Sequence, residues 1–339
     1  MLAETLVVKG SSSRGPWATA IRRLSRDRAG MAALVLFLVI LTMCLLAPVY
    51  AQWAGVDPFR STLDAVVVID GQKIPVMEQS TEGLGLGYNP IGPTWRLGSY
   101  FLGADNQGRD VMARLLYGGL TSLLIAGAAT VLTLALATIL GLSAGFFGGI
   151  IDIVLSRILD VLWAFPVYLL AISLSIVLIT HGIEIGPITI ESGSLWLPIF
   201  IIGIVYIPYV ARPIRGQVLS LRESEFVLAA IGLGVPSHRI LLRDILPNIS
   251  TTLIVFVPLM MALNMLTESA LSFLSIGVQP PDASWGTIIQ DGQGLLYSRP
   301  AVAMAPGIAI VLSVLALNVL GDGLRDALDP RSKIRLGRG

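Results

Sequence analysis

Charged side chains are scarce in this sequence, because Asp, Glu, Lys and Arg together make up only 13% of its 339 residues. Soluble domains carry about 25% charged residues, so the composition excludes an ordinary soluble domain. Hydrophobic residues account for 54% of the chain, a balance that indicates a protein embedded in a membrane. The net charge of +1 gives no overall basic excess for binding nucleic acid, so we expect membrane lipid, and no nucleic acid, around the chain.

Cysteine and histidine are almost absent. The chain has one cysteine, Cys44, and two histidines, His181 and His238. A single cysteine cannot form an internal disulfide, and no paired-cysteine spacing of a metal site occurs. Two histidines far apart in the sequence offer neither a metal site nor a Cys–His nucleophile. We therefore expect no metal, no catalytic residue and no enzymatic activity on this chain.

Two further sequence features are missing. The sequence contains no Gly-x-x-x-x-Gly-Lys followed by Ser or Thr, the loop that cradles nucleotide phosphates, so we expect no ATP or other cofactor on this chain. No cleavable signal peptide is evident either. The first apolar run begins near Met31, after a basic arm, and is too long for the apolar part of a signal peptide. We interpret this run as a retained membrane anchor.

Six apolar stretches are present, and a helix needs roughly 20 apolar residues to cross a bilayer. The third carries Arg157 and Asp160, and the fourth is short and contains Pro198 and Pro208. We expect an all-α polytopic membrane protein with six transmembrane helices. The expected spans are Met31–Tyr50, Leu120–Phe146, Ile153–Ile179, Leu195–Val210, Leu253–Leu274 and Ala303–Leu320.

Basic residues are concentrated in segments that share one side of the membrane if all six stretches cross it. They are frequent in the N-terminal arm, in the loop after the fourth span and in the C-terminal tail, whereas the loop 181–194 has no Lys or Arg. Cytoplasmic segments retain Lys and Arg. Both termini and the loop after the fourth span are therefore expected to be cytoplasmic.

A long outer segment and a long inner loop divide the chain. The outer segment contains STLDAVVVIDGQKIPVM, which predicts a β-hairpin around Asp70 and Gly71. The arm contains the basic amphipathic stretch PWATAIRRLSRDRAG, expected to lie along the inner membrane surface. We divide the chain into a cytoplasmic arm with this interfacial amphipathic helix (1–30), the first transmembrane helix (31–50), an extracytoplasmic segment (51–118), a core domain with five transmembrane helices (119–325) that includes the cytoplasmic loop 213–249, and a cytoplasmic tail (326–339).

The cytoplasmic loop contains EFVLAAIGLGVPSHRILLRDILPN, a stretch too charged to cross a membrane. Small or apolar residues recur on one helical face of it. They are Phe226, Ala229, Ala230 and Leu233. A short helix outside the membrane has little core of its own, so such a face is typical of a helix that docks into a groove on a partner protein.

The same stretch contains signals for two helices separated by a turn. Ser220 and Glu223 have the spacing of a capping box. Gly232 and Gly234 suit a helix end that requires a left-handed residue. Ser237 is expected to cap a second helix, and Pro247 is expected to end it.

Four stretches resemble a known family in their order and spacing. They are AAIGLG followed by ILP, LGADNQGRDVMARLLYGG (Leu102–Gly119), SALSFLSIGVQPPDASWGTII (Ser269–Ile289) and GDGLRDALDP (Gly321–Pro330). All four are similar to the permease subunits of dipeptide and oligopeptide ABC importers, in which the AAIGLG-type loop holds a coupling helix that sits in a cleft of the ATPase subunit. Two positions depart from the general loop pattern, since Leu228 stands where that pattern has Glu and Asp244 where it has Ile.

The resemblance implies a type I ABC importer permease fold in a bacterial or archaeal plasma membrane. It implies a homologous second permease, two ATPase subunits that bind ATP and Mg, and an extracytoplasmic solute-binding protein. Short peptides are the implied substrates, with a nickel chelate or a glutathione-like solute as the alternative. The implied contacts with the ATPase subunit are Glu225, Phe226, Ala229, Ala230, Gly234 and Pro236.

Charged residues near the spans have competing interpretations. Asp105, Arg109 and Asp110 are expected to tie the outer segment to the start of the second span, although a metal or substrate site is an alternative. Arg157 is expected to pair with Asp160, and Glu268 to take part in similar pairing at a helix end.

The rival hypothesis is a proton-coupled transporter that relays protons through Asp160 and Glu268, because an acid at membrane depth is a functional candidate. An integral-membrane enzyme would need a catalytic group of residues that the sequence does not offer.

Gly141 and Gly145 form a GxxxG pair in the second span, which predicts close helix packing. Three tryptophans near span ends are typical of the interfacial belt: Trp163, Trp196 and Trp285.

Overall fold

The computed structural model describes residues 21–69, 71–79, 87–185 and 188–328. The helices are α2 (Arg28–Leu45), α3 (Ala47–Ala54), α4 (Val111–Phe147), α5 (Gly149–Ala164), α6 (Val167–His181), α7 (Trp196–Val205), α8 (Ile207–Arg222), α9 (Glu225–Gly232), α10 (Ser237–Ile240), the π-helical turn η1 (Leu241–Ile245), α11 (Leu246–Phe273), α12 (Trp285–Gly292), the 3-10 turn η2 (Gln293–Leu295) and α13 (Ala301–Leu328). The strands are β1 (Val66–Ile69), β2 (Gln72–Pro75), β3 (Met77–Gln79), β4 (Tyr88–Pro90), β5 (Ile183–Ile185) and β6 (Ile188–Ile190).

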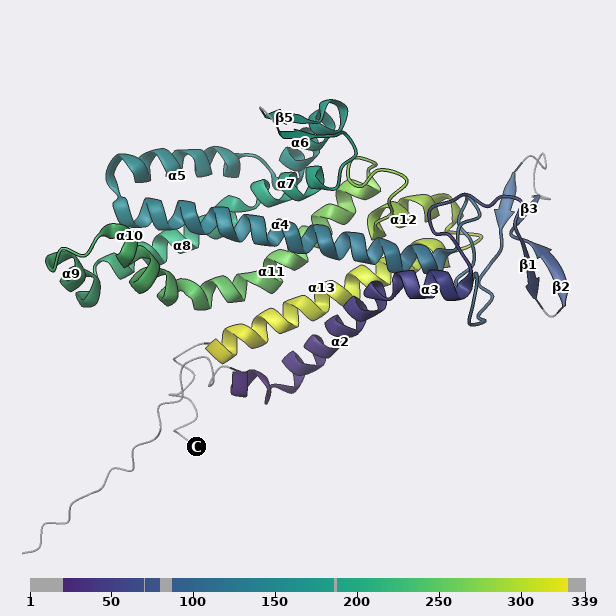
Figure 1. Ribbon diagram of the computed structural model, residues 1–339, viewed down its shortest axis with the longest axis horizontal. Coiled ribbons are helices and arrows are strands. Elements are labelled where there is room, and N and C mark those ends of the chain that lie inside the picture. Colours follow the sequence, from purple (N-terminus) through teal and green to yellow (C-terminus); the bar gives the residue numbers. More distant parts are fainter. Residues whose placement is uncertain (1–20, 70, 80–86, 186–187, 329–339) are drawn as a thin grey trace, which may run out of the picture.

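The long helices run mostly along the long axis of the molecule (Figure 1). Strands β1, β2 and β3 lie at one end of that axis, and α9 and α10 lie at the other. The segment expected outside the membrane and the loop expected in the cytoplasm are therefore at opposite ends of the helix bundle.

Within the described residues, four helical stretches are long and apolar enough to cross a membrane. These are α2, α4, the continuous 37-residue helix from α10 through η1 to α11, and α13. The bent pairs α5 with α6 and α7 with α8 raise the number to six if each pair is one span. This result confirms the all-α polytopic fold, with six spans as the upper count.

The third expected span is not one straight helix, because α5 and α6 meet at a bend of 89°. Phe165 lies between them in an extended conformation, with φ −93° and ψ 138°. A residue that precedes proline is disfavoured in the helical region, and Pro166 has no N–H to continue the helical hydrogen bonds. The expectation of a single helix over 153–179 was therefore wrong.

The fourth expected span continues much further than its apolar part. Helices α7 and α8 are bent by 43°, and α8 runs on to Arg222. Pro208 lies in the first turn of α8, where its missing N–H would have had no helical partner. The prediction that the fourth span ends at Val210 was therefore wrong. The charged second half of α8 continues the helix toward α9.

The strands form three separate antiparallel pairs, β1–β2, β3–β4 and β5–β6. In the first pair, Ile69 lies opposite Gln72 and Val66 opposite Pro75. Gly71 in the turn has φ 79°, a left-handed conformation that glycine adopts without steric cost. The expected β-hairpin is confirmed, while Asp70 itself lies outside the described residues.

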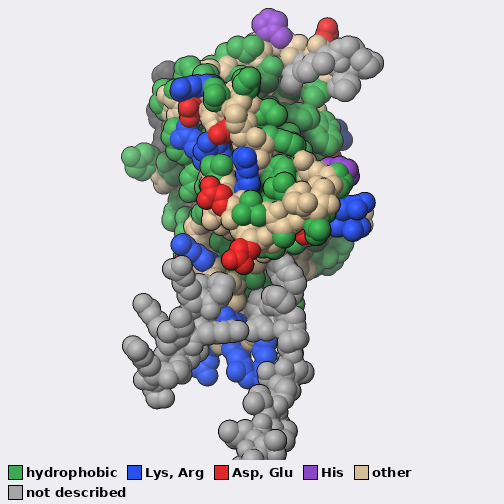
Figure 2. Space-filling view, turned by 90° about the vertical axis from the view of Figure 1, so that its left-hand side faces the viewer, with side chains coloured by type: hydrophobic (Ala, Val, Ile, Leu, Met, Phe, Trp, Pro, Cys, Tyr) green, Lys and Arg blue, Asp and Glu red, His purple; other side chains and the backbone are tan. Residues whose placement is uncertain are grey.

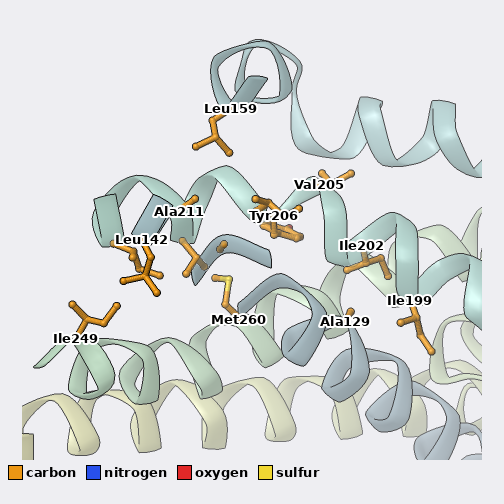
Figure 3. Close-up of a cluster of buried hydrophobic side chains, with 14 of the residues drawn as sticks. Ala129, Leu142, Leu159, Ile199, Ile202, Val205, Tyr206, Ala211, Ile249 and Met260 are labelled. Atoms are coloured by element: carbon orange, nitrogen blue, oxygen red, sulfur yellow. The ribbon is translucent and has the colours of Figure 1, made fainter. Parts of the chain in front are cut away.

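Helix α4 forms the centre of the bundle and packs against α8 and α11 (Figure 3). The buried cluster between them includes Leu142 from α4, Ala211 from α8 and Met260 from α11. Lipid tails are as apolar as these side chains, so the helices are held by close packing rather than by removal of apolar surface from water. Small residues at the contact between α4 and α8 make that packing possible.

Candidate functional site

The loop expected in the cytoplasm folds as a helix, a tight turn and a second helix that continues into a candidate membrane span. Ser224 precedes α9 with an extended backbone, at φ −73° and ψ 148°. Gly234 follows α9 with φ 73°, which confirms the expected left-handed turn at this glycine. A Cβ at Gly234 would meet no atom within 4 Å, so only the backbone conformation requires glycine there.

Three expected helix boundaries in this loop were wrong. Ser220 lies inside α8 and Glu223 is its C-cap, so the two residues do not cap α9. Pro236, rather than Ser237, is the residue that precedes α10. Pro247 lies inside the continuous helix that runs from α10 through the π-helical turn η1 into α11, so it does not end the second helix.

Helix α9 turns an apolar face away from the rest of the chain. Phe226 is 45% exposed, Leu228 is 55% exposed and Leu233 is 84% exposed. On the other side of the helix, Val227 is fully buried, and Ala230 packs half-buried against the main core cluster. The expectation that Ala230 shares the outward face was wrong, because it belongs to the contact between α9 and its own bundle.

The other predicted residues of the loop lie at the surface. Glu225, Ala229 and Pro236 are exposed, and Ile231 is a further exposed apolar residue. Figure 2 looks onto this end of the molecule, where hydrophobic side chains alternate with basic and acidic ones. An exposed apolar helix face bordered by charge is the composition expected of a protein-docking surface.

Helix α8 connects the loop directly to the core, since only Glu223 and Ser224 separate it from α9. A Cβ at Gly141 of α4 would come within 2.7 Å of the Ile214 side chain, and a Cβ at Gly145 within 2.7 Å of Val218. Both contacts confirm the expected close packing at this glycine pair, and its partner is α8. Helix α8 therefore lies between α9 in sequence and α4 in space, and it packs closely against α4.

Two ion pairs also join α8 to α5. The guanidinium of Arg215 donates to both carboxylate oxygens of Asp152, from Nε at 2.5 Å and from Nη2 at 2.6 Å. Arg212 donates to Asp160 at 2.8 Å, and its guanidinium lies 4.9 Å from the ring centroid of Trp163. The two-point contact between Arg215 and Asp152 fixes the orientation of both side chains.

Arg157 contributes little to this connection. It lies 3.6 Å from Asp160, but its side chain is 80% exposed, and such exposed pairs are worth only about 0–1 kcal/mol. The principal partner of Asp160 is instead Arg212. Sequence reasoning missed Arg212, Arg215 and Asp152, because nothing in the sequence shows which face of α5 meets α8.

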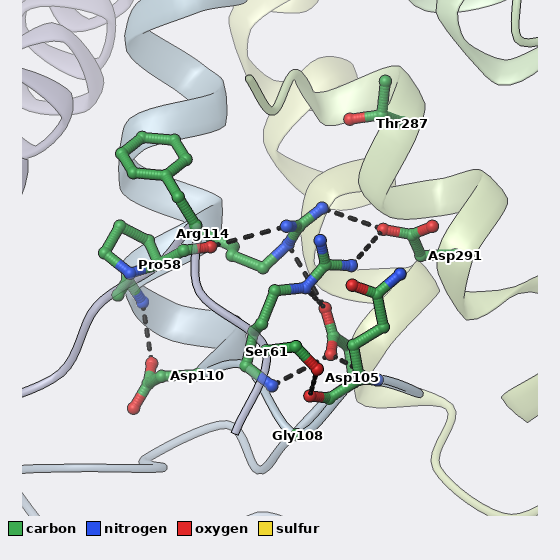
Figure 4. A network of polar contacts seen from close by, with 12 residues as sticks. Pro58, Ser61, Asp105, Gly108, Asp110, Arg114, Thr287 and Asp291 are labelled. Carbon is green, nitrogen blue, oxygen red and sulfur yellow. Dashed lines mark hydrogen bonds and ion pairs between the residues drawn. The ribbon is translucent and has the colours of Figure 1, made fainter. Parts of the chain in front are cut away.

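At the opposite end of the molecule, a buried network joins the outer segment to α12 (Figure 4). Arg109 donates to Asp105 at 2.7 Å and to Asp291 at 2.9 Å. Arg114 donates to the same Asp291 oxygen at 2.8 Å, and its Nε lies 3.3 Å from Asp105. Arg109 and Asp105 therefore pair as predicted, while sequence reasoning missed Arg114 and Asp291.

Asp110 ties the outer segment to the start of α4 as expected, but through backbone hydrogen bonds rather than through an ion pair. It accepts hydrogen bonds from the backbone N–H groups of Ala113 and Tyr100 and so caps the start of α4. Burial raises the pKa of Asp110, and these backbone donors partly offset the rise. Burial also raises the pKa of Asp291, against the opposing effect of Arg114 and Arg109.

Glu268 lies in α11 and is fully buried. Ser272 donates to its Oε1 at 2.8 Å, and Ser122, Ser284 and Ser269 also hydrogen-bond its side chain. The expected charge pairing was wrong for this residue, because hydroxyl groups from α4, α11 and the start of α12 surround the carboxyl. The arrangement connects three elements and resembles a structural polar cluster more than a proton path.

The described part of the chain also contains hollows between its helices. A cavity of about 440 Å³ lies between α8, α11 and α13, lined in part by Gln217, Thr252 and Arg325. Among the described residues, no group of three or more His, Cys, Asp or Glu side chains could hold a metal ion.

Trp285, expected at an interface, is instead buried and donates from its indole N–H to the Leu115 carbonyl at 2.9 Å.

The chain matches two family models. Residues 137–334 match the binding-protein-dependent transport system inner membrane component, and residues 15–62 match the N-terminal transmembrane domain of oligopeptide transport permease C. The first match covers more than half of the chain. The protein belongs to the family of binding-protein-dependent transport system inner membrane components; it is a multi-pass inner-membrane permease of an ABC importer.

Curated relatives cover almost the whole chain. The dipeptide transport system permease protein DppC of Alkalihalophilus pseudofirmus is 34% identical, over 94% of this chain and 91% of its own length. The oligopeptide transport system permease protein OppC of Escherichia coli is 34% identical, over 98% and 95%. The glutathione transport system permease protein GsiD of Pectobacterium atrosepticum is 32% identical, over 98% and 97%.

A solved structure supports the fold independently of these sequences. The inward-facing MetNI methionine ABC transporter matches with a TM-score of 0.51 at 17% sequence identity. The match covers 64% of this chain and 97% of the transporter chain. This likeness confirms the ABC importer permease fold predicted from the sequence.

Proposed function

We propose that this chain forms half of a translocation pathway for short peptides, and that α9 is the helix through which an ATPase subunit moves it. The observation that carries the proposal is the outward apolar face of α9, with Phe226 and Leu233 exposed, on a helix directly joined to α8. Relatives named as dipeptide and oligopeptide permeases support a peptide substrate. A glutathione-like solute is the second candidate, because a glutathione permease is similar over 98% of this chain.

The complete transporter in this proposal contains a homologous second permease, two ATPase subunits and an extracytoplasmic solute-binding protein. ATP and Mg are bound by the ATPase subunits. Both termini and the loop 213–249 lie in the cytoplasm of a bacterial or archaeal cell, and the segment 51–118 lies outside. The residues proposed to contact the ATPase subunit are Glu225, Phe226, Ala229, Gly234 and Pro236, together with the exposed Leu228, Ile231 and Leu233.

The geometry suggests how movement passes through the chain. When the ATPase subunits close on ATP, they displace α9. Helix α8 follows, because only Glu223 and Ser224 separate the two helices. Helix α4 moves with α8 through the Gly141 and Gly145 contacts. Rigid-body motion of packed helices is enough to open the pathway on one side and close it on the other.

The experiment compares ATP hydrolysis with peptide uptake in proteoliposomes that contain the whole complex. Phe226→Asp places a charge on the proposed contact and is expected to abolish uptake and stimulation of hydrolysis by the binding protein. His238→Asp in the same loop is the matched control, since His238 is exposed and outside the apolar face. Normal stimulated hydrolysis and uptake in Phe226→Asp would refute the docking role of α9.

The substrate is tested separately from the coupling. The complex is purified with its solute-binding protein, and the bound molecule is identified by mass spectrometry. Peptides of a few residues are expected. A glutathione-like compound would replace the peptide assignment and leave the coupling mechanism unchanged.

A further inference from the structure

An apolar patch lies where α3 meets the loop that precedes α4. We define the interfacial patch as Val49 and Trp53 of α3 together with Trp95 and Leu97 of the loop. Their exposed fractions are 59%, 62%, 69% and 86%. An exposed apolar patch with two tryptophans marks a site of contact with another protein or with a membrane.

The loop holds its two apolar residues outward by an ordered set of contacts. Thr94 donates to the Tyr100 carbonyl at 3.0 Å, and the Trp95 N–H donates to the Phe101 carbonyl at 3.3 Å. Trp95 and Tyr100 both adopt left-handed backbone conformations, with φ 54° and 58°. A non-glycine residue in this region is strained and persists only where the surroundings determine its conformation.

The patch continues the exposed apolar surface of the first span. Leu46, which precedes α3, and Val49 and Trp53 within it are exposed at positions i, i+3 and i+7, whereas Ala47 and Ala51 on the opposite face are buried. Helix α3 follows directly after α2, which is long and apolar enough to cross the membrane. The exposed stripe of α3 therefore extends the membrane-facing side of α2 at its outer end.

A single hydrogen bond fixes the loop beside this stripe. The Tyr50 hydroxyl donates to the Gly98 carbonyl at 2.8 Å, which places the residue after Leu97 against α3. Tryptophan is enriched where the hydrocarbon core meets the headgroups, because its ring is apolar and its indole N–H is polar. The patch has this composition and lies at the outer end of the first span.

We propose that the interfacial patch inserts into the outer leaflet of the membrane, at the boundary between headgroups and acyl chains. Insertion anchors the extracytoplasmic segment 51–118 to the lipid surface and holds it in a fixed orientation beside the outer end of α4. The occupant is lipid, because the patch continues the exposed apolar side of α2, a helix long and apolar enough to cross the membrane. A docked protein is the alternative that the test must exclude.

The test uses the assembled complex in lipid nanodiscs and a fluorescent probe on a single cysteine. Cys44 is the only cysteine of the chain, so Cys44→Ala provides a background without other thiols. Leu97→Cys carries an environment-sensitive NBD probe, and Val68→Cys on β1, which is 63% exposed, is the matched control. If Leu97→Cys fails to assemble, Trp53→Cys at the other side of the patch replaces it.

The proposal predicts blue-shifted emission from the probe at position 97. Lipids with a doxyl group near the headgroup should quench that probe, and aqueous iodide should not. The probe at position 68 should be quenched by iodide alone. Quenching of the probe at position 97 by iodide in the nanodisc would overturn the proposal. Protection from iodide that appears only after the solute-binding protein is added would also overturn it, because it would identify a protein-docking surface.

Discussion

Gly145 of α4 lies directly against Val218 of α8, so closely that a Cβ on the glycine would come within 2.7 Å of the valine side chain. Gly141 makes the same kind of contact with Ile214 one turn away. These contacts place the helix that leads to the cytoplasmic loop against the helix at the centre of the bundle.

Gly145→Val is expected to separate α4 from α8 and to abolish uptake. Adding methyl groups to a well-packed contact costs about 1–3 kcal/mol, and here the backbone itself would have to move. Gly127→Val in the same helix is the matched control, because a Cβ there would meet only the end of Met261 at 4.0 Å. The assay is peptide uptake, normalised to complex recovered from the membrane; equal losses in both variants would contradict the prediction.

The ion pair between Asp152 and Arg215 is expected to move α5 together with α8. Asp152→Arg should lower uptake per ATP hydrolysed, because it places two like charges side by side. Adding Arg215→Asp reverses the pair and should restore much of the coupling. The ratio of uptake to hydrolysis in proteoliposomes is the measurement. Failure of the reversed pair to improve on Asp152→Arg would show that the contact does not transmit movement.

Arg114→Ala is expected to destabilise the protein strongly. The side chain is 2% exposed and neutralises Asp105 and Asp291, and removal of one partner from a buried ion pair costs about 3–5 kcal/mol. Arg114→Lys keeps the charge but loses the forked geometry, so its loss should be smaller. The thermal unfolding temperature of each variant in nanodiscs is the measurement, and Arg60→Ala at an exposed position is the control. An unfolding temperature of Arg114→Ala equal to that of the control would contradict the structural role of Arg114.

Glu268→Gln is expected to leave uptake intact at every pH, because an amide can still accept hydrogen bonds from the surrounding serines. Glu268→Leu should reduce the amount of folded protein, since it leaves those hydroxyl groups without an acceptor. Uptake by Glu268→Gln is measured with and without a proton gradient. Loss of uptake that depends on the gradient would favour the proton-coupled mechanism instead.

Much of the architecture could be predicted from the sequence. Apolar length predicted the number of spans, and the left-handed turn at Gly234 and the β-hairpin followed from glycine chemistry. The break before Pro166 and the continuation of α8 to Arg222 were missed. Pro208 lies in the first turn of a helix, where proline is tolerated, whereas Pro166 follows the extended Phe165 and breaks the helix. The length of an apolar stretch does not distinguish these two positions.

The site was predicted less completely, for a physical reason. Which face of a short helix points outward depends on what the rest of the chain packs against it. Ala230 fits the expected outward stripe but packs against the core, whereas Leu228 faces outward. The partners Arg114 and Asp291 are 177 residues apart, and only the folded arrangement of α4 and α12 brings them together.

The central claim is that α9 is the contact with the ATPase subunit. The most direct measurement is site-specific photocrosslinking in the assembled complex, with a benzoylphenylalanine residue in place of Leu233, which is 84% exposed. A covalent product between this chain and the ATPase subunit is predicted, while the same probe at Val68 on the outer hairpin should give none. Absence of that product in a complex that hydrolyses ATP and transports its substrate would contradict the account.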